Sequence, residues 1–199
     1  MCSSDLLVVE NDVDAATLAE QKHGHGRGLD TFAFVSIGTG IGMGLVIDGM
    51  LHRGAHGVAG EIGYMPLETG NLEEAGSATA VVRSARAAGL RGPASARRVF
   101  EAAAAGDARA VAVVTAEARL VARSVCAVVT VVDPDLIVLG GGVGQAPGLA
   151  AAVAAELAEL SPAVPEVLVS ALGRDAVVDG CLAAGGELAW HRLTAALQR

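Results

Sequence analysis

The sequence contains few aromatic residues and no long apolar run. Aromatic side chains make up only 3% of the 199 residues, although 52% of the chain is hydrophobic. The core must therefore be built from Ala, Val and Leu in closely packed helices and strands. The most apolar run, Ser124–Val132, is far shorter than the about 20 residues that cross a bilayer, so the sequence predicts no membrane span.

Basic residues and cysteines are also scarce. The chain has 14 Lys and Arg against 22 Asp and Glu, which gives a formal net charge of −8. Nucleic acids are bound by clustered Lys and Arg, so we expect no nucleic-acid contact within these residues. The cysteines, Cys2, Cys126 and Cys181, are odd in number and far apart, which fits neither a disulfide framework nor a metal-binding pair. A cytoplasmic location is the expectation.

The chain starts with a predicted strand and a helix. Leu6–Val9 is typical of a β-strand, and a strand this close to the start leads us to expect a truncated beginning. A helix is predicted over 12–22, with Asn11 or Asp12 as its cap. Asp12 is also a candidate catalytic base, because a carboxylate at the end of a strand can accept a hydroxyl proton during phosphoryl transfer. Judged by residue type alone, helix capping is a more common role for Asp12 than catalysis.

An antiparallel meander is predicted next, followed by helices that alternate with buried strands. The meander has a glycine turn at Gly38–Gly42 and a hairpin turn at Asp48-Gly49, both typical of strand connections. The predicted strands are 31–37, 43–47, 50–53, 136–139 and 167–169, with a loop over 54–63 and a short extended piece over 64–67. The predicted helices are 77–88, 94–105, 107–132, 147–160 and 175 to nearly the C-terminus.

This order of elements is that of the second lobe of an actin-like, or sugar-kinase-type, ATPase. Three segments, Val9–Asp12 (VEND), Ser36–Leu67 and Val131–Val143, resemble the ROK family (repressor, open reading frame, kinase) of bacterial sugar kinases and sugar-sensing regulators. The resemblance implies an α/β, ribonuclease H-like fold, mostly its second lobe. Residues 1–22 would be the end of the first lobe and the segment that crosses to the second. Residues 23–199 would form the second lobe, with a sugar-binding loop at 54–76.

The resemblance also implies substrate-binding residues. In the family's N-D motif the Asp is the catalytic base and the Asn holds sugar hydroxyls, which correspond to Asp12 and Asn11. Glu61 matches a sugar-binding Glu in the signature G-x-x-G-x-A-G-E-I-G-H. Glu73 aligns with a second Glu that contacts sugar, although a solvated surface charge explains it equally well.

Two glycine turns are candidate phosphate and nucleotide sites. Gly38, Thr39 and Gly40 match the family's second phosphate loop, whose backbone N–H groups bind phosphate oxygens. Gly140, Gly141 and Gly142 match its adenosine-side turn. Glycine turns of this kind also occur for folding reasons alone.

The family's zinc ligands are missing. Tyr64 stands where zinc-bearing members have a His, Asn71 replaces the last Cys of their C-x-C-G-x-x-G-C motif, and the other Cys are absent. Because a structural zinc needs four ligands, we expect no zinc and no other metal site. Tyr64 remains a candidate sugar contact through its hydroxyl or ring face.

Two functional hypotheses follow. The first is the sugar-binding, effector half of a ROK-family transcriptional regulator, truncated before the DNA-binding and D-x-G-G-T segments, so that DNA contact needs another segment. The alternative is the C-terminal half of a glucokinase-type enzyme that uses ATP and Mg²⁺, with Asp12 as base; these 199 residues alone are expected to be inactive. Under both, a small-molecule sugar and a second copy in a homodimer are the expected partners. A third possibility is that the chain is a folded remnant whose only role is to dimerise through the helices after Ser77.

Overall fold

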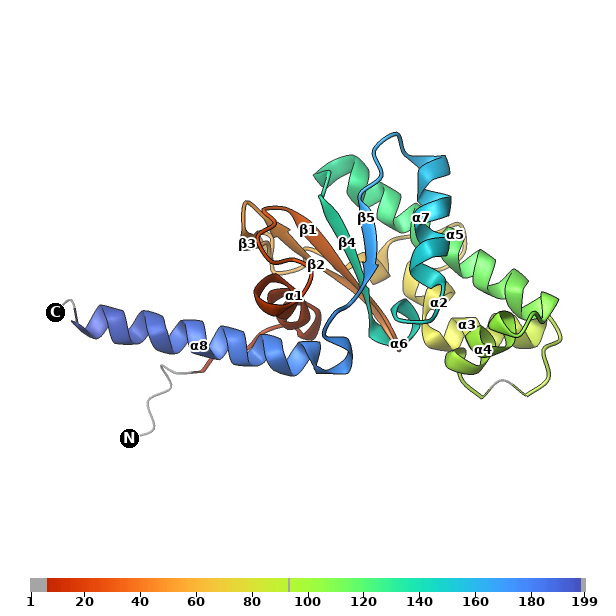
Figure 1. Ribbon diagram of the computed structural model, residues 1–199, viewed down its shortest axis with the longest axis horizontal. Helices are drawn as coiled ribbons and strands as arrows, with labels where there is room; N and C mark the ends of the chain where they lie inside the picture. The colour runs from red at the N-terminus through yellow and green to blue at the C-terminus, as the bar shows by residue number, and fades with distance from the viewer. Residues whose placement is uncertain (1–6, 93, 198–199) are drawn as a thin grey trace.

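A five-stranded mixed sheet forms the centre of the molecule, with helices on both faces (Figure 1). The computed structural model describes residues 7–92 and 94–197. The strands are β1 (Phe32–Ile37), β2 (Ile41–Ile47), β3 (Met50–Leu51), β4 (Leu136–Gly140) and β5 (Glu166–Val169), in the order β3-β2-β1-β4-β5. β1 pairs antiparallel with β2 but parallel with β4, and β4 pairs parallel with β5.

Helices cover the sheet in two layers. The α-helices are α1 (Asp12–His23), α2 (Leu72–Gly76), α3 (Ala78–Ala87), α4 (Ala96–Ala104), α5 (Ala108–Val132), α6 (Gly141–Gly144), α7 (Leu149–Leu160) and α8 (Ala176–Leu197). Two 3₁₀ turns, η2 (Ile62–Tyr64) and η3 (Gly173–Asp175), complete the list. α1 and the start of α8 cover one face, and α5 and α7 cover the other (Figure 1). None of the helices in the described ranges combines the length and apolar character needed to cross a membrane.

Side chains of β1 alternate between the two layers. Phe32 and Phe34 are buried against Ala16 of α1, whereas Val35 and Ile37 belong to the larger core under α5 and α7. A strand buried on both faces needs apolar residues on both, which explains the apolar run over its first four residues. The larger core is mainly Ala, Val, Leu and Ile, as the composition predicts, so the expected α/β architecture with an aliphatic core is confirmed.

The predicted first strand is wrong for the residues that the structure describes. Leu7–Val9 has no strand pairing, and Leu7 and Val9 are 75% and 88% exposed; Leu6 lies outside the described residues. Apolar, β-branched residues favour a strand only when a neighbouring strand supplies hydrogen-bond partners. Among the described residues, this segment pairs with none of the five strands.

The segment 54–76 contains two short helices where the sequence predicted loop and extended chain. Tyr64, the first residue of the expected extended piece, is instead the last residue of η2. Within that piece, Pro66 forms an isolated β-bridge with Asn71. α2 begins with a capping box, in which the Asn71 side chain accepts the Glu74 N–H at 2.9 Å and the Glu74 carboxylate accepts the Asn71 N–H at 3.3 Å. The N-x-x-E spacing at Asn71 is the signal that identifies this helix.

Smaller differences concern the ends of elements. The third strand is only Met50–Leu51 instead of 50–53, and the turn after β4 continues directly into α6. The long helix begins after Asp107, whose side chain accepts two N–H groups of its first turn, as predicted. It ends at Val132, before Asp133, which has a left-handed backbone.

α1 is fixed at both of its ends. At the start, the Asn11 side chain accepts the Val13 and Asp14 N–H groups at 2.8 and 3.2 Å, so Asn11 is the N-cap. Near the end, the fully buried Glu20 carboxylate accepts the Ser170 hydroxyl at 2.6 Å and the His25 N–H at 2.9 Å. The Glu20–Ser170 bond ties the end of α1 to the β5–η3 connection, whereas the other bonds are local to the two helix ends.

α8 crosses α1 closely and then extends beyond the rest of the molecule (Figure 1). A Cβ atom at Gly180 would overlap the backbone carbonyl of Ala15, so only glycine permits this approach. Farther along, Lys22 and Glu187 form an exposed salt bridge at 2.6 Å. The second half of α8 exposes Trp190 at 68%.

One buried carboxyl group in α5 lacks a partner. Glu117 is 5% exposed, and its Oε1 atom is buried with no hydrogen-bond partner within the described residues. Burial raises the pKa of Glu117 to about 8, so the side chain is neutral at pH 7. Its unfolded form ionises near pH 4.5, so deprotonation favours the unfolded chain as pH rises from about 4.5 to 8.

We therefore predict that Glu117→Gln stabilises the protein at high pH. The amide cannot ionise, so the variant should exceed the wild type in free energy of unfolding by about 1–3 kcal/mol at pH 9 and differ little from it at pH 4. Urea unfolding at both pH values measures this. Equal pH dependence in the two proteins would show that folding does not raise the pKa of Glu117.

Two substitutions test the cap of α1. Asn11→Ala removes the acceptor of two N–H groups and should lower the free energy of unfolding by about 1 kcal/mol. Asn11→Asp keeps a side-chain acceptor and should retain most of the stability. The same urea titration compares the three proteins, and a wild-type stability of Asn11→Ala would contradict the capping role.

Candidate functional site

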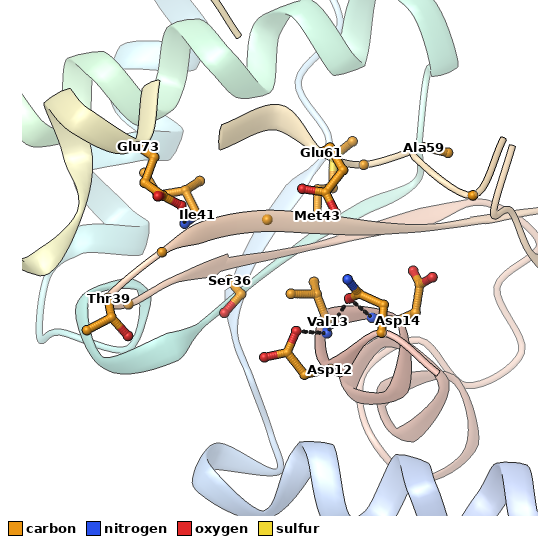
Figure 2. A pocket seen from close by; sticks show the side chains of 16 residues that line it. Asp12, Val13, Asp14, Ser36, Thr39, Ile41, Met43, Ala59, Glu61 and Glu73 are labelled. Atoms are coloured by element: carbon orange, nitrogen blue, oxygen red, sulfur yellow. Dashed lines mark hydrogen bonds between the residues drawn. The ribbon is translucent and has the colours of Figure 1, made fainter. Parts of the chain in front are cut away.

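A cleft of about 260 Å³ lies at the carboxyl end of β1, where the chain turns into β2 (Figure 2). Four segments form it: the start of α1, the β1–β2 turn, the loop before η2, and α2. Its lining consists of Asn11, Asp12, Val13, Asp14, Ser36, Gly38, Thr39, Gly40, Ile41, Gly42, Met43, Gly57, Ala59, Gly60, Glu61 and Glu73. Most residues expected at the sugar and at the phosphate loop therefore meet in one place.

The start of α1 presents two oriented polar side chains. The Asn11 Oδ1 atom is occupied by two helix N–H groups, which leaves its NH₂ group to donate to a ligand. One carboxylate oxygen of Asp12 accepts the Val13 N–H at 2.9 Å. Because Asn11 is the cap, Asp12 is the first helical residue, and its second oxygen has no partner within the described residues. Both side chains are exposed to the cleft.

Asp14 is a third polar residue of α1, and the sequence did not identify it as part of the site. Its side chain lines the cleft although the residue is only 8% exposed. Burial, followed by the charges of Glu10 and Glu61, raises the pKa of Asp14 to about 6; the Arg53 charge opposes this. Arg53 is itself paired with Glu10.

Two glutamates come from the opposite side of β2 (Figure 2). Glu61 precedes η2 and lines the cleft, and its side chain makes no capping hydrogen bond at that helix end among the described residues. The Glu73 Oε2 atom accepts the Ile41 N–H at 3.0 Å, which ties α2 to the first residue of β2. Glu73 thus supports the β1–β2 turn as well as lining the cleft.

Tyr64 is placed differently from the other predicted sugar residues. It ends η2, its side chain is 76% exposed, and it is not among the residues that line the cleft. The short helix places Gly63, not Tyr64, against Glu73 and the backbone of β2. A sugar contact by Tyr64 stays a prediction.

The β1–β2 turn has two unused N–H groups. The Gly38 N–H donates to the Gly40 carbonyl at 2.8 Å, and the Gly38 carbonyl accepts the Ala78 N–H at 2.7 Å. The N–H groups of Thr39 and Gly40 have no hydrogen-bond partner within residues 7–92 and 94–197. Of the predicted phosphate contacts, these two are available to an anion, whereas the Gly38 N–H serves the turn itself.

A second hollow, of about 460 Å³, adjoins the first. It is lined by Asp12, Val13, Ala16, Phe34, Ser36, Gly141, Gly142, Gln145, Gly173, Arg174, Ala176 and Val177. Gly141 has φ +76°, and a Cβ there would overlap the Ile37 carbonyl, so this glycine is needed for the fold. A Cβ at Gly142 would meet nothing within 4 Å, which leaves its backbone open to the hollow. Gly140 packs against Phe34 and lines neither hollow.

Asp12 and Ser36 line both hollows and mark the boundary between them. The second hollow also contains Arg174, a cation suited to phosphate. The sequence analysis missed Ser36 and Arg174; a Ser just before the glycine turn was a signal for the first. Arg174 follows β5 by several residues, and only the fold brings it beside Gly142.

No metal centre is apparent in the described part of the chain. No group of three or more His, Cys, Asp or Glu there is arranged to hold a metal ion. The expected absence of zinc stays a prediction.

Comparison with known sequences identifies the family. The sequence model of the ROK family matches residues 6–183. The bifunctional enzyme NanE/NanK of Brucella melitensis is 38% identical over 141 residues, which cover 68% of this chain and 27% of that protein. N-acetylmannosamine kinase of Citrobacter koseri is 36% identical over 171 residues, which cover 81% of this chain and 58% of that enzyme. The chain thus spans less than two thirds of these relatives.

Solved structures of similar fold include both a kinase and a regulator. A ROK family glucokinase from Streptomyces griseus, in complex with glucose and AMPPNP, superposes with a TM-score of 0.78 at 27% identity and covers 87% of this chain and 66% of its own. A ROK family transcriptional regulator, a homologue of the E. coli MLC protein, superposes with a TM-score of 0.80 at 27% identity, covering 90% and 52%. The actin-like, sugar-kinase-type fold is therefore confirmed, and the chain belongs to the ROK family.

Proposed function

We propose that this chain is the sugar-binding half of a ROK-family protein and acts as the effector-binding part of a transcriptional regulator. The observation that carries the proposal is the convergence of Asn11, Asp12 and Glu61 in one cleft. Residues 23–199 would form the second lobe, preceded by the crossing segment 1–22. DNA would be contacted by a segment outside these residues, and a second copy would complete a homodimer.

The cleft has the groups that bind a polyol. A carboxylate accepts hydrogen bonds from two adjacent hydroxyls, and charge-assisted bonds are stronger than neutral ones. Asp12 and Glu61 can each accept in this way, and the Asn11 NH₂ group can donate. The helix N–H groups that hold Asn11 and Asp12 fix both side chains before a ligand arrives, which reduces the entropy lost on binding.

One feature favours the regulator over a kinase. The zinc ligands of the family's metal-bearing members are replaced at Tyr64 and Asn71. Tyr is a rare zinc ligand, and metal-free variants with a Tyr at this place resemble the regulators more than the kinases.

A sugar kinase is the second candidate, and the position of Asp12 supports it. Asp12 and Ser36 lie between the sugar cleft and the second hollow. A catalytic base must lie at this boundary if a phosphoryl group passes from a nucleotide in the second hollow to a sugar in the cleft. The second hollow fits a nucleotide phosphate through Arg174 and the open backbone of Gly142. ATP with Mg²⁺ would supply the phosphoryl group there, and Asp12 would accept the proton of the sugar hydroxyl.

Calorimetric titration of the chain with hexoses and N-acetylhexosamines tests sugar binding. Glu61→Gln removes a charged acceptor and should weaken the best sugar by about ten- to a hundred-fold. Glu159→Gln, at an exposed position on α7, is the matched control and should bind as the wild type does. Unchanged affinity in Glu61→Gln would refute the assigned sugar site.

A phosphorylation assay tests whether these residues alone have kinase activity. We predict that the chain with ATP, Mg²⁺ and a bound sugar forms no sugar phosphate, because the first lobe's phosphate donors are missing. Product formation that Asp12→Asn abolishes, with sugar binding retained, would establish the kinase and overturn the regulator proposal.

A further inference from the structure

The cleft is strongly and unevenly charged. Four carboxylates line it, namely Asp12, Asp14, Glu61 and Glu73, whereas its lining contains no Lys, Arg or His. Like charges in a partly enclosed space repel one another and attract a cation from solution. A neutral sugar would satisfy hydrogen bonds in this cleft but would leave its net charge unbalanced.

Asp14 differs from the other three carboxylates. Asp12 and Glu73 each accept a backbone N–H, and Glu61 is exposed to water. As a residue, Asp14 is only 8% exposed. Its carboxylate oxygens still reach the cleft, and they have no hydrogen bond or salt bridge within the described residues. A partly desolvated charge without a partner is less stable than a hydrogen-bonded one, so Asp14 is the carboxylate with the most to gain from a ligand.

The Asp14 side chain is directed into the cleft. In Figure 2 it extends from the first turn of α1 toward the loop that carries Ala59 and Glu61. The nearby cation, Arg53, is engaged by Glu10 and does not line the cleft. Asp14 is therefore free to meet a group of the ligand beside the positions of Asn11 and Asp12.

We propose that Asp14 is a specificity residue that binds the ammonium group of an amino sugar, whose hydroxyls are held by Asn11, Asp12 and Glu61. The inference rests on the proposed sugar-binding function and names its ligand class: a hexose with a free, protonated amino group. An ammonium group donates three hydrogen bonds and carries the charge that the cleft lacks. An inorganic cation suits the cleft less, since its carboxylates are not grouped as metal ligands in the described residues.

Titration behaviour provides a second signature. Burial and the charges of Glu10 and Glu61 raise the pKa of Asp14 to about 6, against the effect of Arg53. An ammonium ligand favours the ionised form of Asp14, so binding at pH 6 releases a proton. As pH falls below about 6, Asp14 becomes protonated in the free protein, and the preference for the amino sugar decreases progressively.

Calorimetry at pH 6 with three 2-amino hexoses tests the proposal, each compared with its parent hexose and its N-acetyl form. The wild type should bind the best amino sugar about tenfold more tightly than both neutral analogues. In Asp14→Asn, which keeps the size of the side chain, the ratio should fall to about one while neutral hexoses still bind. Asp135→Asn, an exposed position at the opposite end of the sheet, is the control and should keep the ratio.

The outcomes separate this inference from the function on which it rests. Repeating the titration in buffers of different ionisation enthalpy should show proton release for the wild type and none for Asp14→Asn. Neutral sugars that bind as well as amino sugars, or a preference that persists in Asp14→Asn, would overturn the role of Asp14 alone. Failure of every sugar to bind would overturn the sugar-binding function itself. If Mg²⁺ alone bound to the wild type but not to Asp14→Asn, the site would be a metal site, and this result would likewise refute the proposal.

Discussion

The pairing of β1 in opposite directions with its two neighbours determines where the site can form. The turn after β1 lies at the carboxyl end of that strand, and β2 returns antiparallel from it. Because β4 runs parallel, the turn after β4 lies at the same edge of the sheet. Two glycine-rich turns, far apart in the sequence, thus lie side by side, and α1 brings Asp12 between them.

Much of this arrangement could be predicted from the sequence. The alternation of apolar stretches with glycine turns predicts most strands and helices, and the motif around Asn11 and Asp12 predicts two residues of the cleft. Leu7–Val9 could not be predicted correctly, because strand formation depends on a neighbour that local sequence does not reveal. α2 could have been predicted from the capping box at Asn71, a signal hidden inside a glycine-rich stretch.

Asp14 shows a different limit of sequence analysis. An acidic residue in the first turn of a helix is explained by the helix dipole, and this explanation is sufficient until the helix is packed. Only the fold shows that Asp14 is largely buried, that its carboxylate has no partner among the described residues, and that it lines the same cleft as Glu61. Arg174 is a similar case, since its place beside Gly142 depends on β5 and η3 rather than on any motif.

The close crossing of α1 and α8 affects which sequence changes this protein tolerates. Gly180 lines neither hollow, yet any side chain there would push against the Ala15 carbonyl, one residue beyond Asp14 in the same rigid helix. A substitution at position 180 would therefore shift Asp12 and Asp14 together without touching a ligand. The shape of the cleft therefore depends in part on the absence of a side chain at position 180 of α8.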